Sequence, residues 1–228
     1  MVTAVERVLS TSLRAGARPD AWTWLEAALA PSSRAALLDA YTRVPLRVGR
    51  GPLHLTADDV QQLRVVAPGI GFERWTVDDA ARAWLLIGHR RSGVTGDGFV
   101  AAALECFEQG DAREQQSWLR AIALWPEAKA FLPHAIDACR TNIVPVFEAL
   151  ACENPYPAAY FPDRNFNQVV LKAMFNNIAL SRIVSLGSRL NAELTRMARD
   201  YSAERTAAGR SVPADIHLAM HDATQATD

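Results

Sequence analysis

The sequence predicts an all-α protein: an irregular helical bundle or an α-solenoid-like stack of short antiparallel helices, with no sheet. Three observations support this fold class. Hydrophobic residues recur three and four positions apart along almost every segment. Thr or Asp followed by acidic residues precedes several of these segments, as is typical of helix N-termini. No segment alternates hydrophobic and polar residues between hairpin-type dipeptides, as paired strands would.

In the first third of the chain, two sequences mark helix starts. Thr56 and Thr76 are each followed by a hydrophobic residue and two aspartates, so each is expected to cap a helix whose first turn is acidic. Between and after these helices, clusters of Gly and Pro predict loops. The expected loops are residues 44–55, residues 67–74 and, as a shorter turn, residues 93–98.

The middle of the chain predicts short helices in close succession. Asp111 is expected to cap a helix that carries Trp118 and Trp125 on one face. Pro126 is expected to open the next helix and Pro133 to kink it. Near-equal, closely linked helices over residues 76–152 indicate antiparallel pairs stacked side by side, although no exact repeat is present.

Two further helices are expected near the C-terminus. Asp163 should start a helix over residues 163–178, where its carboxylate lies at the positive end of the helix dipole. Asn191 should cap an amphipathic helix that Gly209 terminates. We predict one all-helical domain over residues 1–222, with its most characteristic motifs in residues 154–213 and a frayed tail at 223–228.

Composition restricts the classes of function. The formal net charge is −1, which disfavours nucleic-acid binding. The three cysteines have no CxxC spacing, so they are expected to be core thiols of a protein from a reducing compartment. Neither a signal-peptide pattern nor an apolar run of membrane-spanning length is present. The chain is therefore expected to be cytoplasmic and not membrane-embedded, with its six tryptophans in core packing.

The helix over residues 163–178 carries an unusual polar stripe. On a helical wheel, four polar side chains fall within about 80° of one another: Asn165, Gln168, Lys172 and Asn176. Most of the remaining circumference is apolar. Asn167 lies outside the stripe, inside the apolar arc, so it needs a buried partner, expected from residues 154–161. The stripe is either a solvated face or part of a ligand pocket, whose candidate residues are Tyr156, Asn165, Asn167, Gln168, Lys172, Asn176 and Arg182.

A second candidate surface is rich in arginine. Residues 182–210 contain six arginines and three acidic residues, enough to contact a phosphate or an acidic partner. The alternative is a solvated face on which Arg196 pairs with Asp200 one turn away. The candidate partner-binding residues are Arg196, Arg199, Arg205 and Arg210.

No catalytic or metal signature is present. His217 and His221 have the spacing of two metal ligands on one helical face, but the HExxH signature is absent. Gly96-Asp97-Gly98 lacks the Lys and Ser/Thr of a phosphate loop and is interpreted as a turn. We therefore predict no metal, no cofactor and no catalytic residue, and a non-catalytic protein is favoured while an enzyme stays open.

Three C-terminal motifs, NPYPAAYF, FNQVVLKAMF and LTRMARDYSAERTAAGRSVP, resemble the EboA family. The resemblance implies a bacterial cytosolic protein encoded with a gene cluster that makes or exports a secondary metabolite. Neighbouring genes of such clusters resemble a prenyltransferase, a sugar-phosphate cyclase and metal-dependent hydrolases. The family supplies no catalytic roles for the matching residues, which are Asn154, Tyr156, Asn167, Gln168, Lys172, Arg205, Gly209 and Arg210.

Together these observations predict an accessory, non-catalytic helical protein of such a cluster. It would act by binding partner proteins encoded in the same cluster or a polar pathway metabolite. The alternative is a small-molecule-binding protein or cryptic enzyme with a polar pocket around Asn167 and Lys172.

Overall fold

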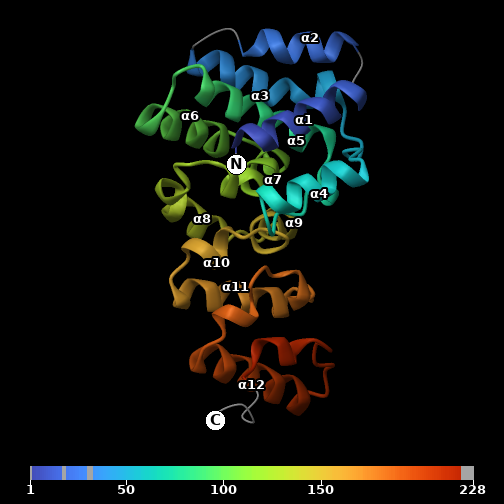
Figure 1. Cartoon of the computed structure of the whole chain (residues 1–228). Coiled ribbons are helices and arrows are strands. Elements are labelled where there is room, and N and C mark those ends of the chain that lie inside the picture. Colours follow the sequence, from blue (N-terminus) through green and yellow to red (C-terminus); the bar gives the residue numbers. More distant parts are fainter. Residues whose placement is uncertain (1, 17–18, 30–32, 222–228) are drawn as a thin grey trace. The chain divides into compact units, whose positions relative to one another are not determined.

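The computed structural model describes residues 2–16, 19–29 and 33–221. Within these ranges the chain forms twelve α-helices and six short 3-10 helices, with no strand beyond an isolated bridge between Pro52 and Thr76 (Figure 1). The all-α prediction is therefore confirmed. The chain forms two compact units, residues 1–150 and residues 151–228. A single domain over residues 1–222 stays a prediction, and the tail predicted at 223–228 lies outside the described residues.

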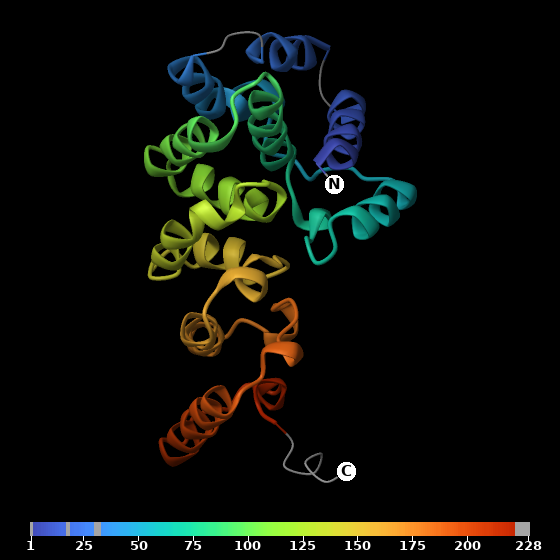
Figure 2. The same cartoon turned by 60° about the vertical axis from the view of Figure 1, so that its left-hand side comes forward.

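Helix α5 is the central element of the first unit. It packs against α1, α3 and α7, and every residue from Asp78 to His89 is buried (Figures 1 and 2). The helices of this unit are α1 (Val2–Gly16), α2 (Pro19–Ala28), α3 (Arg34–Val48), α4 (Ala57–Val66), α5 (Val77–Arg91), α6 (Gly96–Glu108), α7 (Ala112–Ala121), α8 (Leu132–Ala138) and α9 (Val144–Ala151), whose last residue falls in the second unit.

Aromatic side chains from α7 and from the residues that follow it fill part of the core of this unit. Trp118 packs at 4.8 Å from Trp125 and at 5.2 Å from Phe131, measured between ring centroids. The indole N–H of Trp118 donates to the carbonyl of Ala103 at 2.7 Å, so its polar atom is satisfied in the core. Trp75, Trp84, Trp118 and Trp125 are buried as expected, whereas Trp22 and Trp24 are only half-buried.

Three predicted helix starts of the first unit are confirmed. Thr56, Thr76 and Asp111 each form a capping box with the acidic residue three positions later. The proline predictions were wrong. Pro126 lies in a turn, and Pro133 lies in the first turn of α8, where its missing N–H leaves no bond unmade, so it does not kink the helix.

Two predicted turns of the first unit proved to be helical. Residues 44–48 continue α3, and Pro45 lies inside that helix. Gly96-Asp97-Gly98 forms the first turn of α6 instead of a separate turn. Gly96 and Gly98 are tolerated in a first helical turn, where the N–H groups have no partner within the helix, whereas Pro45 does cost α3 one backbone bond.

The second unit contains three α-helices, α10 (Tyr156–Tyr160), α11 (Asp163–Phe175) and α12 (Ala192–Ala207). Helix α11 packs against α12, and the hydroxyl of Tyr201 donates to the carbonyl of Met174 at 3.1 Å. The predicted helix over 163–178 ends earlier, because Asn177 adopts a left-handed conformation with φ of 54°. No helix among the described residues is long and apolar enough to cross a membrane.

Candidate functional site

The polar stripe predicted on α11 is present and partly solvent-exposed. Gln168 is exposed, whereas Asn165, Lys172 and Asn176 are half-buried. An open groove of ≈ 590 Å³ runs beside the helix and is lined by Asp163, Arg164, Asn167, Gln168, Asn191 and Glu193, among others. Of the predicted ligand residues, the groove brings together only Asn167 and Gln168.

Asn167 is buried, as its place on the helical wheel predicts. Its side-chain amide forms a reciprocal pair with that of Asn191, with two N–H···O bonds of 3.0 Å. The Oδ1 of Asn191 also accepts the backbone N–H of Leu194, so the same side chain caps α12, as predicted. The partner expected from residues 154–161 was wrong: the pair joins α11 to the start of α12.

Tyr156 and Arg182 lie away from this groove. Tyr156 is fully buried, and burial raises the pKa of its hydroxyl above the ordinary value. Arg182 forms a bidentate ion pair with Glu153 at 2.8 and 3.0 Å, while its carbonyl accepts the backbone N–H of Glu153. This double connection holds residue 153, which has a φ of 46°, against the 3-10 helix Leu180–Arg182.

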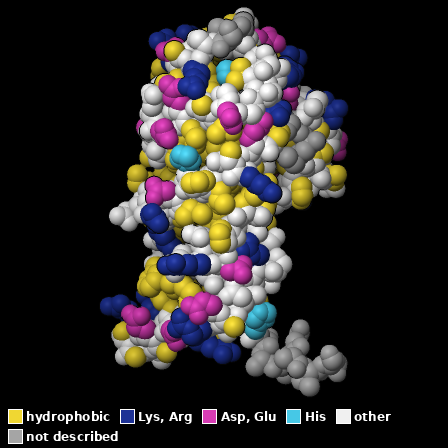
Figure 3. Space-filling model, turned by 90° about the vertical axis from the view of Figure 1, so that its left-hand side faces the viewer, with side chains coloured by type: hydrophobic (Ala, Val, Ile, Leu, Met, Phe, Trp, Pro, Cys, Tyr) yellow, Lys and Arg dark blue, Asp and Glu magenta, His cyan; other side chains and the backbone are white. Residues whose placement is uncertain are grey.

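The arginines of α12 have different environments. Arg196 pairs with Glu193 at 2.7 Å and with Asp200 at 2.6 Å, the i,i+4 pair of the solvated-face interpretation. Arg205 donates to the carbonyl of Ser211 at 2.9 Å. Arg199 and Arg210 are exposed. Basic and acidic side chains are interspersed on the face drawn in Figure 3, without an extended area of one sign.

The His217 and His221 pair does not share a face of an α-helix. His217 lies in the 3-10 helix Ile216–Ala219, and His221 follows that helix. Within the described ranges, no group of three or more His, Cys, Asp or Glu side chains could hold a metal ion. Cys106 and Cys152 are buried as expected, whereas Cys139 is half-buried.

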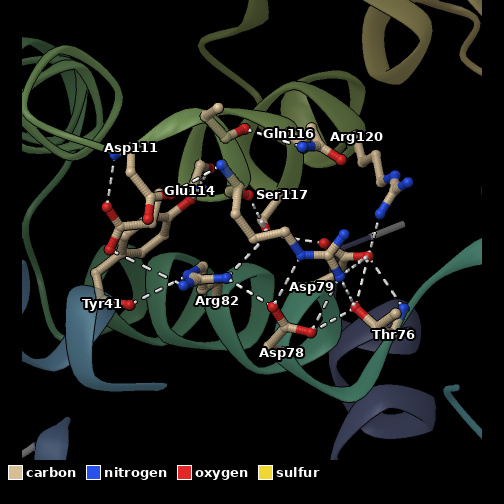
Figure 4. A network of polar contacts seen from close by, with 12 residues as sticks. Tyr41, Thr76, Asp78, Asp79, Arg82, Asp111, Glu114, Gln116, Ser117 and Arg120 are labelled. Atoms are coloured by element: carbon tan, nitrogen blue, oxygen red, sulfur yellow. Dashed lines mark hydrogen bonds and ion pairs between the residues drawn. The ribbon is translucent and has the colours of Figure 1, made fainter. Parts of the chain in front are cut away.

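The sequence did not predict a buried charge network between α5 and α7. Acidic and arginine side chains meet there, together with Thr76, Ser117 and Tyr41 (Figure 4). Its charged members, connected by ion pairs, are Asp78, Asp79, Arg82, Arg113, Glu114 and Arg120. The two aspartates are completely buried, and Arg82 is 1% exposed.

Arg82 is the centre of this network. It donates to the carboxylate of Asp78 at 3.0 Å and to the hydroxyl of Ser117 at 3.1 Å. Its Nε donates to the backbone carbonyl of Tyr41 at 3.1 Å. That carbonyl lies four residues before Pro45, which has no N–H to donate to it. The arginine of α5 therefore supplies the bond that the proline removes from α3.

Asp79 joins the two helices from the other side. Its carboxylate accepts the backbone N–H of Thr76 at 3.0 Å, which completes the cap of α5. It also accepts a hydrogen bond from the hydroxyl of Ser117 at 2.7 Å and forms an ion pair with Arg120. Both of these residues lie on α7. One carboxylate thus caps its own helix and fixes the neighbouring helix.

Within the network, the bonds between Asp78 and Arg113 favour the charged forms of these two side chains. Burial alone would raise the pKa of Asp78, but hydrogen bonds from Arg113 and Thr76 and the charges of Arg113 and Arg82 outweigh it. The pKa of Asp78 is therefore held below its usual value. Burial would lower the pKa of Arg113, and the bond to Asp78 and the neighbouring carboxylates raise it instead.

The network satisfies its own polar groups. No network side chain is among the described buried N/O atoms that have no hydrogen-bond partner. The sequence signal was present, since Arg113, Ser117 and Arg120 recur at helical spacing on α7. It could not be assigned a role without knowing which helix faces α7.

Comparison with known proteins identifies the family. No curated protein and no solved structure matches the chain. The family model described as "Metabolite traffic protein EboA" matches residues 5–221, which include most of both units. The match confirms the resemblance inferred from the C-terminal motifs and extends it through the N-terminal helices. The chain therefore belongs to the EboA family.

Proposed function

We propose that this chain is an accessory, non-catalytic protein of metabolite traffic that acts by binding. The traffic role follows from the family, whose description names it. The observation that supports binding over chemistry is the closed network between α5 and α7. Its ionisable groups bond to one another, whereas a catalytic site directs such groups toward a space that the substrate enters.

The proposed role has a cellular setting. The protein would work in the cytoplasm of a bacterium, beside proteins encoded in the same secondary-metabolite cluster. Its ligand would be a polar pathway metabolite, or its partner would be one of those proteins. For a protein partner, Arg199 and Arg210 are the exposed arginines of the predicted set, whereas Arg196 is already paired with two acidic residues.

Binding without conversion can be measured directly. The purified chain is mixed with an extract of the producing cells, recovered by gel filtration and analysed by mass spectrometry. We expect a host metabolite, unchanged in mass, in an amount no greater than that of the protein. The same metabolite should raise the unfolding temperature, because a ligand selective for the native state stabilises it. Consumption of a metabolite by substoichiometric protein would refute the non-catalytic role.

A second candidate function is a small-molecule site or cryptic enzyme around Asn167 and Lys172. The groove beside α11, which Asn167 and Gln168 line, favours this candidate. Replacement of Gln168 by Ala should then weaken metabolite retention, and Lys172→Ala should lower metabolite production in the host. Glu204→Ala, an exposed change on α12 at a residue outside both candidate sets, is the matched control. If the folded Lys172→Ala protein supports normal production, this candidate fails.

A further inference from the structure

A second groove is lined by residues of α1, α2 and α5 in the first unit. These three helices pack against one another (Figures 1 and 2). The groove has a volume of ≈ 470 Å³, within the range of about 300–1,000 Å³ that small-molecule sites occupy. Helix α1 contributes a stripe to it, because Thr3, Arg7, Ser10 and Arg14 recur four, three and four positions apart. All the lining residues except Leu29 therefore lie on these three helices.

Two tryptophans form the apolar wall of this groove. The rings of Trp22 and Trp84 lie 5.1 Å apart between centroids, tilted by 56°. The guanidinium of Arg14 lies over the ring of Trp22 at 4.4 Å. Two tilted aromatic rings beside a cation provide a surface for a flat, apolar group that carries a negative charge.

The charges lining the groove do not cancel. Glu6, which is buried, pairs with Arg91 at 3.1 Å, and Glu26 pairs with Arg14 at 3.2 Å. Arg7 lines the same groove, and its guanidinium has no acidic partner within the described ranges. Three arginines against two glutamates leave one positive charge without a counter-ion.

The groove also contains an unsatisfied donor. Trp84 is 4% exposed, and its indole N–H has no hydrogen-bond acceptor among the described residues. Buried N–H groups are almost always bonded, and a protein that leaves one open commonly does so for a ligand or a water molecule. Trp84, which carries this donor, and Arg7 therefore line the same groove.

From the unsatisfied Trp84 donor and the positive charge of Arg7 we infer that the groove between α1, α2 and α5 binds a small organic anion with a flat apolar body. The carboxylate or phosphate of the ligand faces Arg7, one of its acceptors receives the Trp84 N–H, and its body packs against Trp22. This inference rests on the proposed function, since it names the chemical class of the metabolite that the protein would hold.

The test follows the six indole N–H signals of the full chain, labelled with 15N-tryptophan, by NMR. The Trp84 signal is assigned with the Trp84→Phe variant, which keeps an aromatic ring in the wall. The probes are naphthalene-2-carboxylate and 2-naphthyl phosphate, and the uncharged control is naphthalene-2-carboxamide. We expect both anions, or the one whose head group fits, to shift the Trp84 signal saturably, with the amide binding at least tenfold more weakly, as loss of a charge-assisted hydrogen bond implies.

Two arginine variants separate the site from general charge. Arg7→Gln, an exposed change with little risk to folding, should weaken anion binding roughly tenfold. Arg140→Gln, an exposed change just after α8 and outside the groove lining, removes the same charge and should leave binding unchanged. A Trp84 signal that no probe moves, equal binding of amide and anions, or full affinity in Arg7→Gln would each overturn the inference.

The outcome is distinguishable from that of the proposed function. If the Arg7→Gln and Trp84→Phe proteins retain the host metabolite as well as the unaltered chain does, the site assignment fails and the binding role stands. If the unaltered chain turns over a metabolite while its Trp84 signal responds to the probes, the non-catalytic role fails and the anion site stands.

Discussion

Replacing Arg82 by Met tests whether the buried network holds the first unit together. Methionine fills a similar volume without donors, so Asp78 loses one cation and the Tyr41 carbonyl loses its bond from α5. Breaking a buried ion pair by removing one partner destabilises a protein by roughly 3–5 kcal/mol. Because Asp78 keeps Arg113, we expect the lower end, about 3 kcal/mol, out of roughly 5–15 kcal/mol for a domain.

The role of Pro45 is tested by a double-mutant cycle. Pro45→Ala restores a backbone N–H that can donate to the Tyr41 carbonyl within α3. Its change in helix propensity is the same in both backgrounds and cancels in the cycle. In the Arg82→Met background the new bond replaces the lost one, so the coupling energy between the two changes should be about 1 kcal/mol, the net contribution of one hydrogen bond.

Urea unfolding followed by tryptophan fluorescence measures these changes in the first unit alone. The reason is that all six tryptophans lie within residues 1–150: Trp22, Trp24, Trp75, Trp84, Trp118 and Trp125. Arg64→Met is the matched control, because the exposed Arg64–Glu73 pair should contribute less than about 1 kcal/mol. If Arg82→Met behaves like this control, or if the cycle is additive within about 0.5 kcal/mol, the reasoning is refuted.

Three further measurements probe other features. Burial lowers the pKa of His89, so the unfolded state binds the proton first as pH falls. The stability that is present above a pH of about 6.5 is therefore lost at lower pH. His89→Leu should reduce this loss of stability between pH 7 and 5, and an unchanged pH dependence would contradict the reasoning. Asn167→Ala should lower the unfolding free energy of the second unit by about 1–3 kcal/mol, as circular dichroism can measure. Adding Asn191→Ala to this variant should cost less than Asn191→Ala does in the unaltered chain. Additive effects of the two changes would argue against the amide pair. Burial raises the pKa of Cys106 to about 12, so iodoacetamide should modify Cys139 first in the native protein, and mass spectrometry showing the reverse order would refute this.

The helix starts could be predicted because both partners of each cap lie close together in the sequence. Thr56 and Asp59 are three residues apart, as are Asp111 and Glu114. A pattern over four residues therefore contains the whole interaction. The burial of Asn167 was predictable for the same reason, since the period of one helix decides it.

The buried network could not be predicted, because its partners are distant in the sequence. Arg113 bonds to Asp78 across 35 residues, Ser117 to Asp79 across 38, and Arg82 to Tyr41 across 41. From the sequence, the two aspartates were only acids in a first helical turn. Which helix faces α5 depends on packing between whole helices, and no local pattern encodes that choice.

The network and the proposed anion site share one helix, and this connects stability to function. Asp78, Asp79 and Arg82 lie on the N-terminal half of α5, while Trp84 and Arg91 of the groove lie further along it. Rotation of α5 would break charge-assisted bonds to α3 and α7, so the network fixes which side chains the helix presents to α1 and α2. A binding site on a rigid helix is preorganised, because its side chains need not be ordered when the ligand arrives. The Arg82→Met protein, where it remains folded, should therefore bind the naphthalene anions more weakly although Arg82 does not line the groove. Unchanged affinity would show that the groove is formed without the network.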